Sequence, residues 1–363
     1  MLLTESNIAF YLMDKGLITN KSIVEGKFTA HVADSRNNNF VINRDFSDQS
    51  QYFIKQVKAL DKEKTDTLRI EATCYWLANN DDDYQALKAF LPKYYDFDYL
   101  NHILIIENLS DCISLHEYFL QKQNISLEIA HQQAEVLASY HGALSEKIQQ
   151  SQSMKLFAKG KPWVFSIASQ DYTQWMATTP KAEQQTMQLI LGNKEFLSLI
   201  QALENTWQTK SLVHNDIKFT NFLVNKSVFE EQKAQIRLID WELADIGDPC
   251  WDIAAMFCSY LMLWVQNSDT QYHYLPMSFS PEALKPAFQE FWKTYTQKMD
   301  LSKTQSQEML LKSMKFCGLK LIHTCFETTP YTQTLQPQSA KLLQLSLNIL
   351  KAPEQSISSL LGL

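Results

Sequence analysis

Short apolar and aromatic runs separated by polar turns mark the first third of the chain. Three of them, FTAHVAD, NFVINRD and QYFIKQV, lie between residues 28 and 57 and are rich in β-branched and aromatic residues. Such runs predict strands of an antiparallel sheet. Helical spacing of apolar residues predicts one helix before them, over 4–15, and another after them, over 65–77. A further strand-like run, ILIIENL, covers residues 103–109.

Beyond residue 107 the apolar spacing becomes predominantly helical. Two segments interrupt it, LVHNDIKFTNFLV at 212–224 and IRLIDWELADIGD at 236–248, and each combines a short strand with a loop. The pattern therefore predicts an α+β protein with a small β-rich N-terminal lobe, residues 1–106, and a larger helical C-terminal lobe, residues 107–363. Helices are predicted over residues 126–148, 181–207, 249–266, 281–299, 304–326 and 337–351.

The composition excludes several classes of protein function. The 363 residues carry a formal net charge of -7, which argues against broad nucleic-acid binding because that requires clustered Lys and Arg. Only eight glycines occur, and no Gly-rich phosphate loop is among them. The six cysteines lack metal-site spacing, the N-terminus lacks a secretory pattern, and the apolar run Ile253–Val265 is too short for a membrane span. We expect a cytoplasmic protein with no membrane anchor.

The two interrupting segments carry the candidate chemistry. Asp216 and Asn221 fall in a His-x-Asp-x-x-x-x-Asn stretch, and Asp240 follows a second apolar run 24 residues after Asp216. Phosphoryl transfer from ATP needs a carboxylate near the attacking hydroxyl and oxygen ligands for Mg²⁺. Asp216 can supply the first, and Asn221 and Asp240 can supply the second. The alternative is that these residues serve only as turn formers.

A lysine and a glutamate upstream fit the same chemistry. Lys55 stands within the strand-like run QYFIKQV, and Glu71 lies 16 residues later on the predicted helix. A lysine held by a glutamate can bind the α- and β-phosphates of ATP. Taken one at a time, either residue could be ordinary surface charge.

In these motifs the chain resembles the aminoglycoside phosphotransferase and choline kinase-like family, the small-molecule branch of the protein-kinase-like fold. The resemblance covers about residues 30–265 and is carried by LVHNDIKFTNFLV and LIDWELADIGDPCWDIA. Protein kinases carry Asp-Phe-Gly and Ala-Pro-Glu motifs instead. Here Trp241-Glu242 follows Asp240, and the sequence contains no Ala-Pro-Glu.

The resemblance implies a two-lobed kinase that uses ATP and Mg²⁺. It implies that Asp216 is the catalytic base, that Asn221 and Asp240 bind Mg²⁺, and that Lys55, oriented by Glu71, binds phosphate. The backbone at Glu107 and Leu109 would bind adenine. Asp252 would be structural rather than catalytic, and a small-molecule hydroxyl compound would be the acceptor, bound between the catalytic loop and the helices after residue 249.

Two features depart from the family pattern. The turn at residues 34–40 has no glycine. Its backbone N–H groups could still bind phosphate, or the segment could be an ordinary solvent-exposed hairpin turn. Lys218 stands two residues after Asp216, as in Ser/Thr protein kinases, where such a lysine meets the γ-phosphate. A protein or peptide kinase is therefore one alternative function, and a nucleotide-binding pseudokinase scaffold is another. The sequence does not name the acceptor.

Three further features have structural interpretations. We expect His214 to brace the loop backbone, and His141 to be either a packing residue or a residue that supports the site without touching substrate. We expect the aromatic residues between Trp251 and Trp264 to be core, and the alternative is that their faces hold a cationic ligand.

Overall fold

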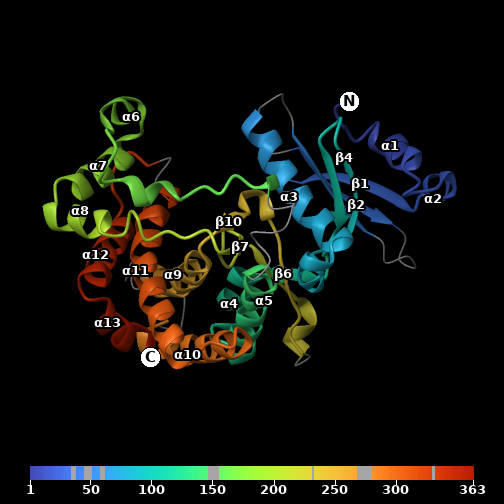
Figure 1. Ribbon diagram of the computed structural model, residues 1–363. Coiled ribbons are helices and arrows are strands. Elements are labelled where there is room, and N and C mark those ends of the chain that lie inside the picture. Colours follow the sequence, from blue (N-terminus) through green and yellow to red (C-terminus); the bar gives the residue numbers. More distant parts are fainter. Residues whose placement is uncertain are drawn as a thin grey trace. The chain divides into compact units, whose positions relative to one another are not determined.

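The computed structural model describes residues 1–33, 38–44, 51–57, 62–145, 155–230, 233–267, 279–328 and 332–363 (Figure 1). The chain forms two compact units. The first comprises residues 1–114 and 221–244, and the second comprises residues 115–220 and 245–363. The functional division into 1–106 and 107–363 stays a prediction.

The first unit contains a five-stranded antiparallel sheet in the order β1-β2-β3-β5-β4. Side chains on β3 alternate, so Tyr52, Ile54 and Gln56 are buried on one face and Lys55 points to the other. The buried face packs with Ile8 and Leu12 of the N-terminal helix α1. The strands are β1 (Phe28–Ala33), β2 (Asn38–Arg44), β3 (Tyr52–Gln56), β4 (Tyr94–Asp98) and β5 (Ile103–Glu107), preceded by α1 (Ile8–Asp14) and α2 (Asn20–Val24).

A second small sheet explains why residues 221–244 belong to the first unit. Its order is β6-β8-β9, and β8 pairs with a strand on each side. The remaining elements of this unit are the helix α3 and three short 3-10 helices. Their bounds are β6 (Cys112–Ser114), β8 (Phe222–Asn225), β9 (Ile236–Leu238), α3 (Lys62–Asn80), η1 (Asp82–Ala89), η4 (Lys226–Glu230) and η5 (Trp241–Leu243).

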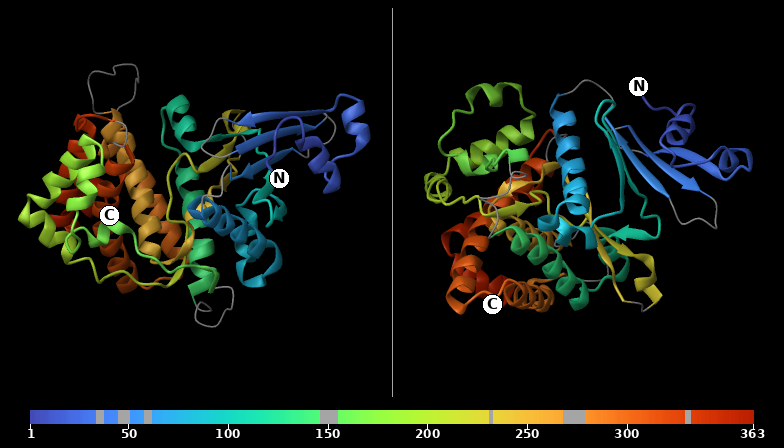
Figure 2. Two further views of the ribbon diagram at one scale, coloured as in Figure 1. Left: turned by 90° about the horizontal axis from the view of Figure 1, so that it is seen from above. Right: turned by 45° about the vertical axis from the view of Figure 1, so that its right-hand side comes forward.

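The second unit is mainly helical and has one short antiparallel pair, β7 (Ser211–Val213) with β10 (Asp245–Gly247). Within it, α11 (Lys303–Thr328) packs against both α9 and α12 (Figures 1 and 2). The other elements are α4 (Leu115–Lys122), α5 (Leu127–Ser145), η3 (Trp163–Ser166), α6 (Thr173–Thr178), α7 (Lys181–Leu191), α8 (Lys194–Gln201), α9 (Pro249–Asn267), α10 (Pro281–Lys298), α12 (Pro337–Lys351), α13 (Pro353–Ser356) and η6 (Ile357–Leu361).

Most helices match the sequence pattern, with one correction. The single helix predicted over 181–207 is wrong, because α7 ends at Leu191 and α8 begins at Lys194. Asn193 caps α8, its side chain accepting a hydrogen bond from the Phe196 N–H at 3.0 Å. The apolar residues keep their helical spacing across this cap, so the spacing alone predicted one continuous helix.

Most of the aromatic residues of α9 are core, as predicted: Trp251, Phe257 and Tyr260 are at most 1% exposed, whereas Trp264 is half-buried. Among the helices that the structure describes, none has the length and apolarity needed to span a membrane.

Candidate active site

In the first unit, Lys55 joins two carboxylates. Its Nζ lies 2.9 Å from both carboxylate oxygens of Glu71 and 2.9 Å from Oδ1 of Asp240. Lys55 lies on β3, Glu71 lies on α3, and Asp240 is the residue directly before η5. The ion pair that the sequence suggested is therefore present, and it includes a third residue from a distant part of the chain. The phosphate-binding role of the pair stays a prediction.

Burial and charge oppose each other in this cluster. Burial disfavours the Lys55 ammonium, but attraction to Glu71 and Asp240 outweighs it and raises the pKa of Lys55. Burial raises the pKa of Glu71 to about 7, against the opposing attraction of Lys55. The lysine thus keeps its charge at neutral pH in a site where Glu71 is only 1% exposed.

Strand pairing brings the two predicted metal ligands close in this unit. Phe222 of β8 pairs with Leu238 of β9, and the Ile239 N–H donates to the Asn221 carbonyl at 3.0 Å. Asn221, just before β8, therefore lies opposite Ile239, and Asp240 is the next residue along the chain. Asp240 adopts the left-handed conformation, φ 68° and ψ 53°. Asp and Asn tolerate this region better than most residues, and such strain clusters at functional sites.

The proposed adenine-binding segment follows β5. The Glu107 N–H donates to the Lys93 carbonyl at 2.8 Å, while the Lys93 N–H donates to the Glu107 carboxylate at 3.0 Å. The Glu107 N–H is therefore already engaged within the protein, and the adenine-binding role of this segment stays a prediction. The Cys112 N–H bonds the Leu109 carbonyl at 3.1 Å, so the chain turns directly after this segment.

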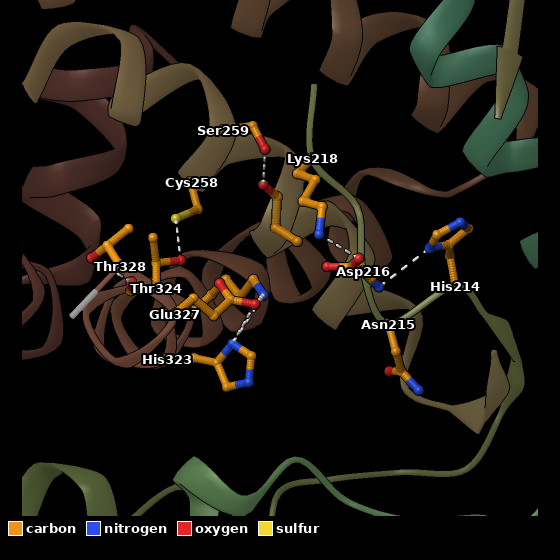
Figure 3. A network of polar contacts seen from close by, with 12 residues as sticks. His214, Asn215, Asp216, Lys218, Cys258, Ser259, His323, Thr324, Glu327 and Thr328 are labelled. Atoms are coloured by element: carbon orange, nitrogen blue, oxygen red, sulfur yellow. Dashed lines mark hydrogen bonds and ion pairs between the residues drawn. The ribbon is translucent and has the colours of Figure 1, made fainter. Parts of the chain in front are cut away.

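In the second unit, the predicted base Asp216 is 7% exposed. Oδ2 of Asp216 lies 2.6 Å from Nζ of Lys218, which projects from the same loop (Figure 3). The preceding residue, Asn215, has a φ of 65°, so the loop turns sharply before the base. The Asp216 N–H donates to Nδ1 of His214 at 3.2 Å, so His214 braces the loop backbone as predicted.

Asp252 supports this loop from α9. One of its oxygens accepts from the His214 N–H at 2.7 Å and the other from the Asn215 N–H at 3.0 Å. Tyr140 donates its hydroxyl to Asp252 at 2.6 Å, and Nε2 of His141 lies 3.3 Å away. Although Asp252 is fully buried, these partners hold its pKa below the usual range.

Sequence reasoning missed a polar row near the end of α11. Lys320, His323 and Glu327 contact one another, and Figure 3 shows His323 and Glu327 in the same view as Asp216 and Lys218. Their spacing of three and four residues places them on one helical face, which was the available signal. This signal did not stand out because polar residues occur along the whole of α11.

The Gly-free turn at residues 34–40 falls mostly outside the described residues, which omit 34–37. Its last residues, Asn38 to Phe40, begin β2.

Comparison with known proteins identifies the family of the chain. Residues 106–329 match the family described as choline/ethanolamine kinase, which is more than half of the chain. The chain belongs to the choline/ethanolamine kinase family. The predicted family resemblance is confirmed, and the protein is a kinase, a small-molecule phosphotransferase acting on hydroxyl groups. A comparison with curated protein sequences found no match.

Solved structures support the fold. The choline kinase from Cryptosporidium parvum Iowa II is 14% identical, with 97% of this chain and 96% of that chain covered and a TM-score of 0.52. A mutant of aminoglycoside 2'-phosphotransferase IIIa in complex with GDP is 14% identical, with 98% of each chain covered and a TM-score of 0.51. The predicted fold class, α+β with a protein-kinase-like architecture, is thereby confirmed.

Proposed function

We propose that this kinase transfers the γ-phosphate of ATP to a hydroxyl group of a small molecule, with Mg²⁺ bound to the nucleotide. The observation that carries the proposal is the Lys55 ammonium held at 2.9 Å by both Glu71 and Asp240. A fixed, charged lysine beside a carboxylate that can bind metal is what the phosphates of Mg-ATP require. In this proposal residues 1–106 form the nucleotide lobe, and the Glu107 carbonyl and the Leu109 backbone bind adenine.

The donors fit Mg²⁺. Asn221 and Asp240 offer amide and carboxylate oxygens just beyond the adjoining ends of β8 and β9. Mg²⁺ usually takes one or two such ligands together with phosphate oxygens and water. A bound Mg²⁺ would supply charge neutralisation for the phosphates. Asp240 would then hold metal and Lys55 together, while Glu71 keeps the lysine in place.

Asp216 has the role of base in this proposal. The acceptor oxygen attacks the γ-phosphorus, the bond from that phosphorus to the β–γ bridging oxygen breaks, and ADP leaves. The hydroxyl proton passes to the Asp216 carboxylate, whose loop is held by Asp252 and His214. Lys218, 2.6 Å from Asp216, is placed to balance charge on the transferred phosphoryl group.

The protein-kinase alternative has less support. Only residues 241–248 separate Asp240 from Pro249 of the Gly-Asp-Pro turn, and that stretch is filled by η5 and β10. No room remains there for a long activation segment that would organise a peptide groove. The pseudokinase alternative is disfavoured because Lys55, Asp216, Asn221 and Asp240 are all intact.

The test is direct. The purified protein is incubated with Mg-ATP and a pooled panel of hydroxyl metabolites and antibiotics, and products heavier by one phosphate are sought by mass spectrometry. A parallel reaction contains a protein extract. Stoichiometric labelling of one protein, with no small-molecule product, would transfer support to the protein-kinase alternative.

A further inference from the structure

Asp245, in the second unit, is a buried carboxylate that accepts hydrogen bonds from a distant part of the chain. Oδ1 of Asp245 accepts from the Lys159 N–H at 2.7 Å, and Oδ2 accepts from the Gly160 N–H at 2.6 Å. Oδ1 also accepts from the N–H of the next residue, Ile246, at 2.7 Å. The residue is 9% exposed. A buried carboxylate is costly unless it is hydrogen-bonded, so these N–H groups stabilise Asp245, and Asp245 in turn fixes the segment that carries Lys159 and Gly160.

The segment that Asp245 fixes is residues 158–162, which we call the strap. It contains neither helix nor strand and leads directly into η3. Lys159 has a φ of 61°, a left-handed conformation that is costly for a residue other than glycine. The two hydrogen bonds to Asp245 come from this residue and the next. They therefore stabilise a backbone conformation that the strap would not keep by itself.

The far end of the strap is fixed on α11. Phe165 of η3 is fully buried and packs edge-on against Phe316 of α11 at 4.8 Å. Trp163, the first residue after the strap, packs edge-on against Phe326 at 5.0 Å and lies 6.1 Å from the His323 ring. Phe316, Phe326 and His323 all belong to α11. The strap therefore ends against this helix.

The near end of the strap lies beside the catalytic loop. Asp245 is the first residue of β10 and pairs with Val213, the last residue of β7. The next residue, His214, opens the loop that carries Asp216. The carboxylate that holds the strap is thus on the strand next to the one from which the catalytic loop departs.

The length of the strap limits the distance that it crosses. Trp163 follows Lys159 by four residues, and an extended chain covers at most about 3.6 Å per residue, or about 14 Å in all. The strap therefore runs from the strand pair of the catalytic loop to α11 within that distance. An acceptor bound between the catalytic loop and the helices after residue 249 would lie along it.

We propose that Asp245 is a positioning residue for the acceptor site: it fixes the strap, and the fixed strap forms the side of that site that runs from the catalytic loop to α11. The proposal rests on the proposed kinase function and adds to it a residue that acts through the backbone of Lys159 and Gly160. Asp245 touches neither the nucleotide nor the acceptor in this scheme.

The kinetic experiment uses choline or ethanolamine as the acceptor where either gives product, and otherwise the compound of the hydroxyl panel that does. Asp245→Ala should raise KM for the acceptor by about tenfold while kcat changes less, because a freed strap must be ordered again each time the acceptor binds. The Kd of Mg-ATP should not change. Asp245→Asn keeps one acceptor oxygen and should give a smaller increase in KM. Asp171→Ala is the matched control, since this exposed aspartate also accepts a backbone N–H but lies outside the strap.

A second variant acts from the other partner of the hydrogen bond. Gly160→Pro removes the N–H that Oδ2 of Asp245 accepts and leaves β10 unchanged. It should reproduce the increase in acceptor KM, so it keeps the test decisive should Asp245→Ala not fold. Hydrogen exchange measures the strap itself: the Lys159 and Gly160 amides should exchange faster in Asp245→Ala than in Asp171→Ala.

The outcomes separate this proposal from the broader one. An acceptor KM that is unchanged in Gly160→Pro and in folded Asp245→Ala would overturn it, even if the strap amides exchange faster, because the strap would then be only a connection. An equal loss of affinity for Mg-ATP would also overturn it, because the damage would not be confined to the acceptor site. Failure of the unchanged protein to bind Mg-ATP, or to phosphorylate any compound of the panel, would instead contradict the proposed function.

Discussion

At the scale of single residues, two aspartates carry the proposed chemistry, and their backbone conformations differ. Asp240 has a φ of 68°, whereas the turn before Asp216 is made by Asn215 with a φ of 65°. Asn tolerates the left-handed region about as well as Asp does. Replacing either aspartate by Asn therefore removes a charge with little change in backbone preference.

Asp216→Asn should bind Mg-ATP with unchanged affinity and lose about 10²–10⁴-fold in transfer rate, because general-base assistance is worth that much. Asp300→Asn is the control, since Asp300 is exposed and removing its charge leaves the proposed site unchanged. Turnover is measured by ADP release and affinity by calorimetry. A folded variant that transfers phosphate at the rate of the control would remove Asp216 from this role.

Asp240→Asn should reduce the Mg²⁺ dependence of ATP binding, because an anionic oxygen ligand becomes neutral and Lys55 loses one of its two carboxylate partners. Calorimetric titration of ATP with and without Mg²⁺ measures this directly. Asp66→Asn, an exposed change on α3, is the control. If the variant retains the full gain in affinity from Mg²⁺, Asp240 is not a metal ligand.

Interactions between elements hold the catalytic loop. Asp252 connects α9 to the loop through two backbone N–H groups and to α5 through Tyr140 and His141, and His141 continues to Tyr295 of α10 at 2.9 Å. The ionised carboxylate is the acceptor for the two N–H groups and for Tyr140 and His141, whereas Tyr295 is connected to it only through His141. Its loss therefore affects three helices as well as the loop.

Asp252→Asn should destabilise the protein by about 3 kcal/mol at pH 7, because buried charge-assisted hydrogen bonds are lost. The pKa of Asp252 is lowered in the folded state, so its stabilisation is present above the ordinary value of 3.8 and is lost as pH falls through the folded-state pKa. The difference in urea unfolding midpoint between the unchanged protein and Asp252→Asn should narrow below about pH 4. A gap that stays constant from pH 7 to pH 3 would show that the charge of Asp252 contributes nothing.

The helices α11 and α12 approach each other closely at Gly318, and this contact gives a second prediction about interactions between elements. A Cβ at Gly318 would lie 2.8 Å from two side-chain carbons of Leu350, and Ser346 donates its hydroxyl to the Gly318 carbonyl at 2.7 Å. Gly318→Ala should therefore destabilise by about 1–3 kcal/mol despite its gain in helix propensity. In a double-mutant cycle with Leu350→Ala, the two costs should fall short of adding. Fully additive costs would indicate that no steric conflict exists there.

At the scale of the whole molecule, nucleotide binding and folding are linked. A ligand that binds only the native protein stabilises it by about 2.7 kcal/mol at a concentration 100 times Kd. Saturating Mg-ATP should therefore raise the Tm of the intact chain, and the metal-free nucleotide should raise it less. Thermal unfolding followed by circular dichroism measures both shifts. Equal Tm values with and without Mg-ATP would contradict nucleotide binding.

The sequence by itself determined the order of elements and the family. Periodicity of apolar residues depends on local backbone geometry, so it located the strands β1, β2, β3 and β5 and the helices α9 to α12 closely. It could not place the break between α7 and α8, because the Asn193 cap leaves the apolar spacing intact. The motifs around Asp216 and Asp240 were readable for a similar reason, since each keeps a fixed spacing along the chain.

Tertiary structure alone decided which distant residues share a site. Lys55 and Asp240 are 185 residues apart, and no local pattern relates them before β3 and the β8–β9 pair are folded into one unit. The contacts of Glu327 with Lys320 and His323 are local, but what this face of α11 meets depends on how α11 packs against α9 and α12. Spacing along a chain governs the face on which a side chain lies, whereas packing governs what that face meets.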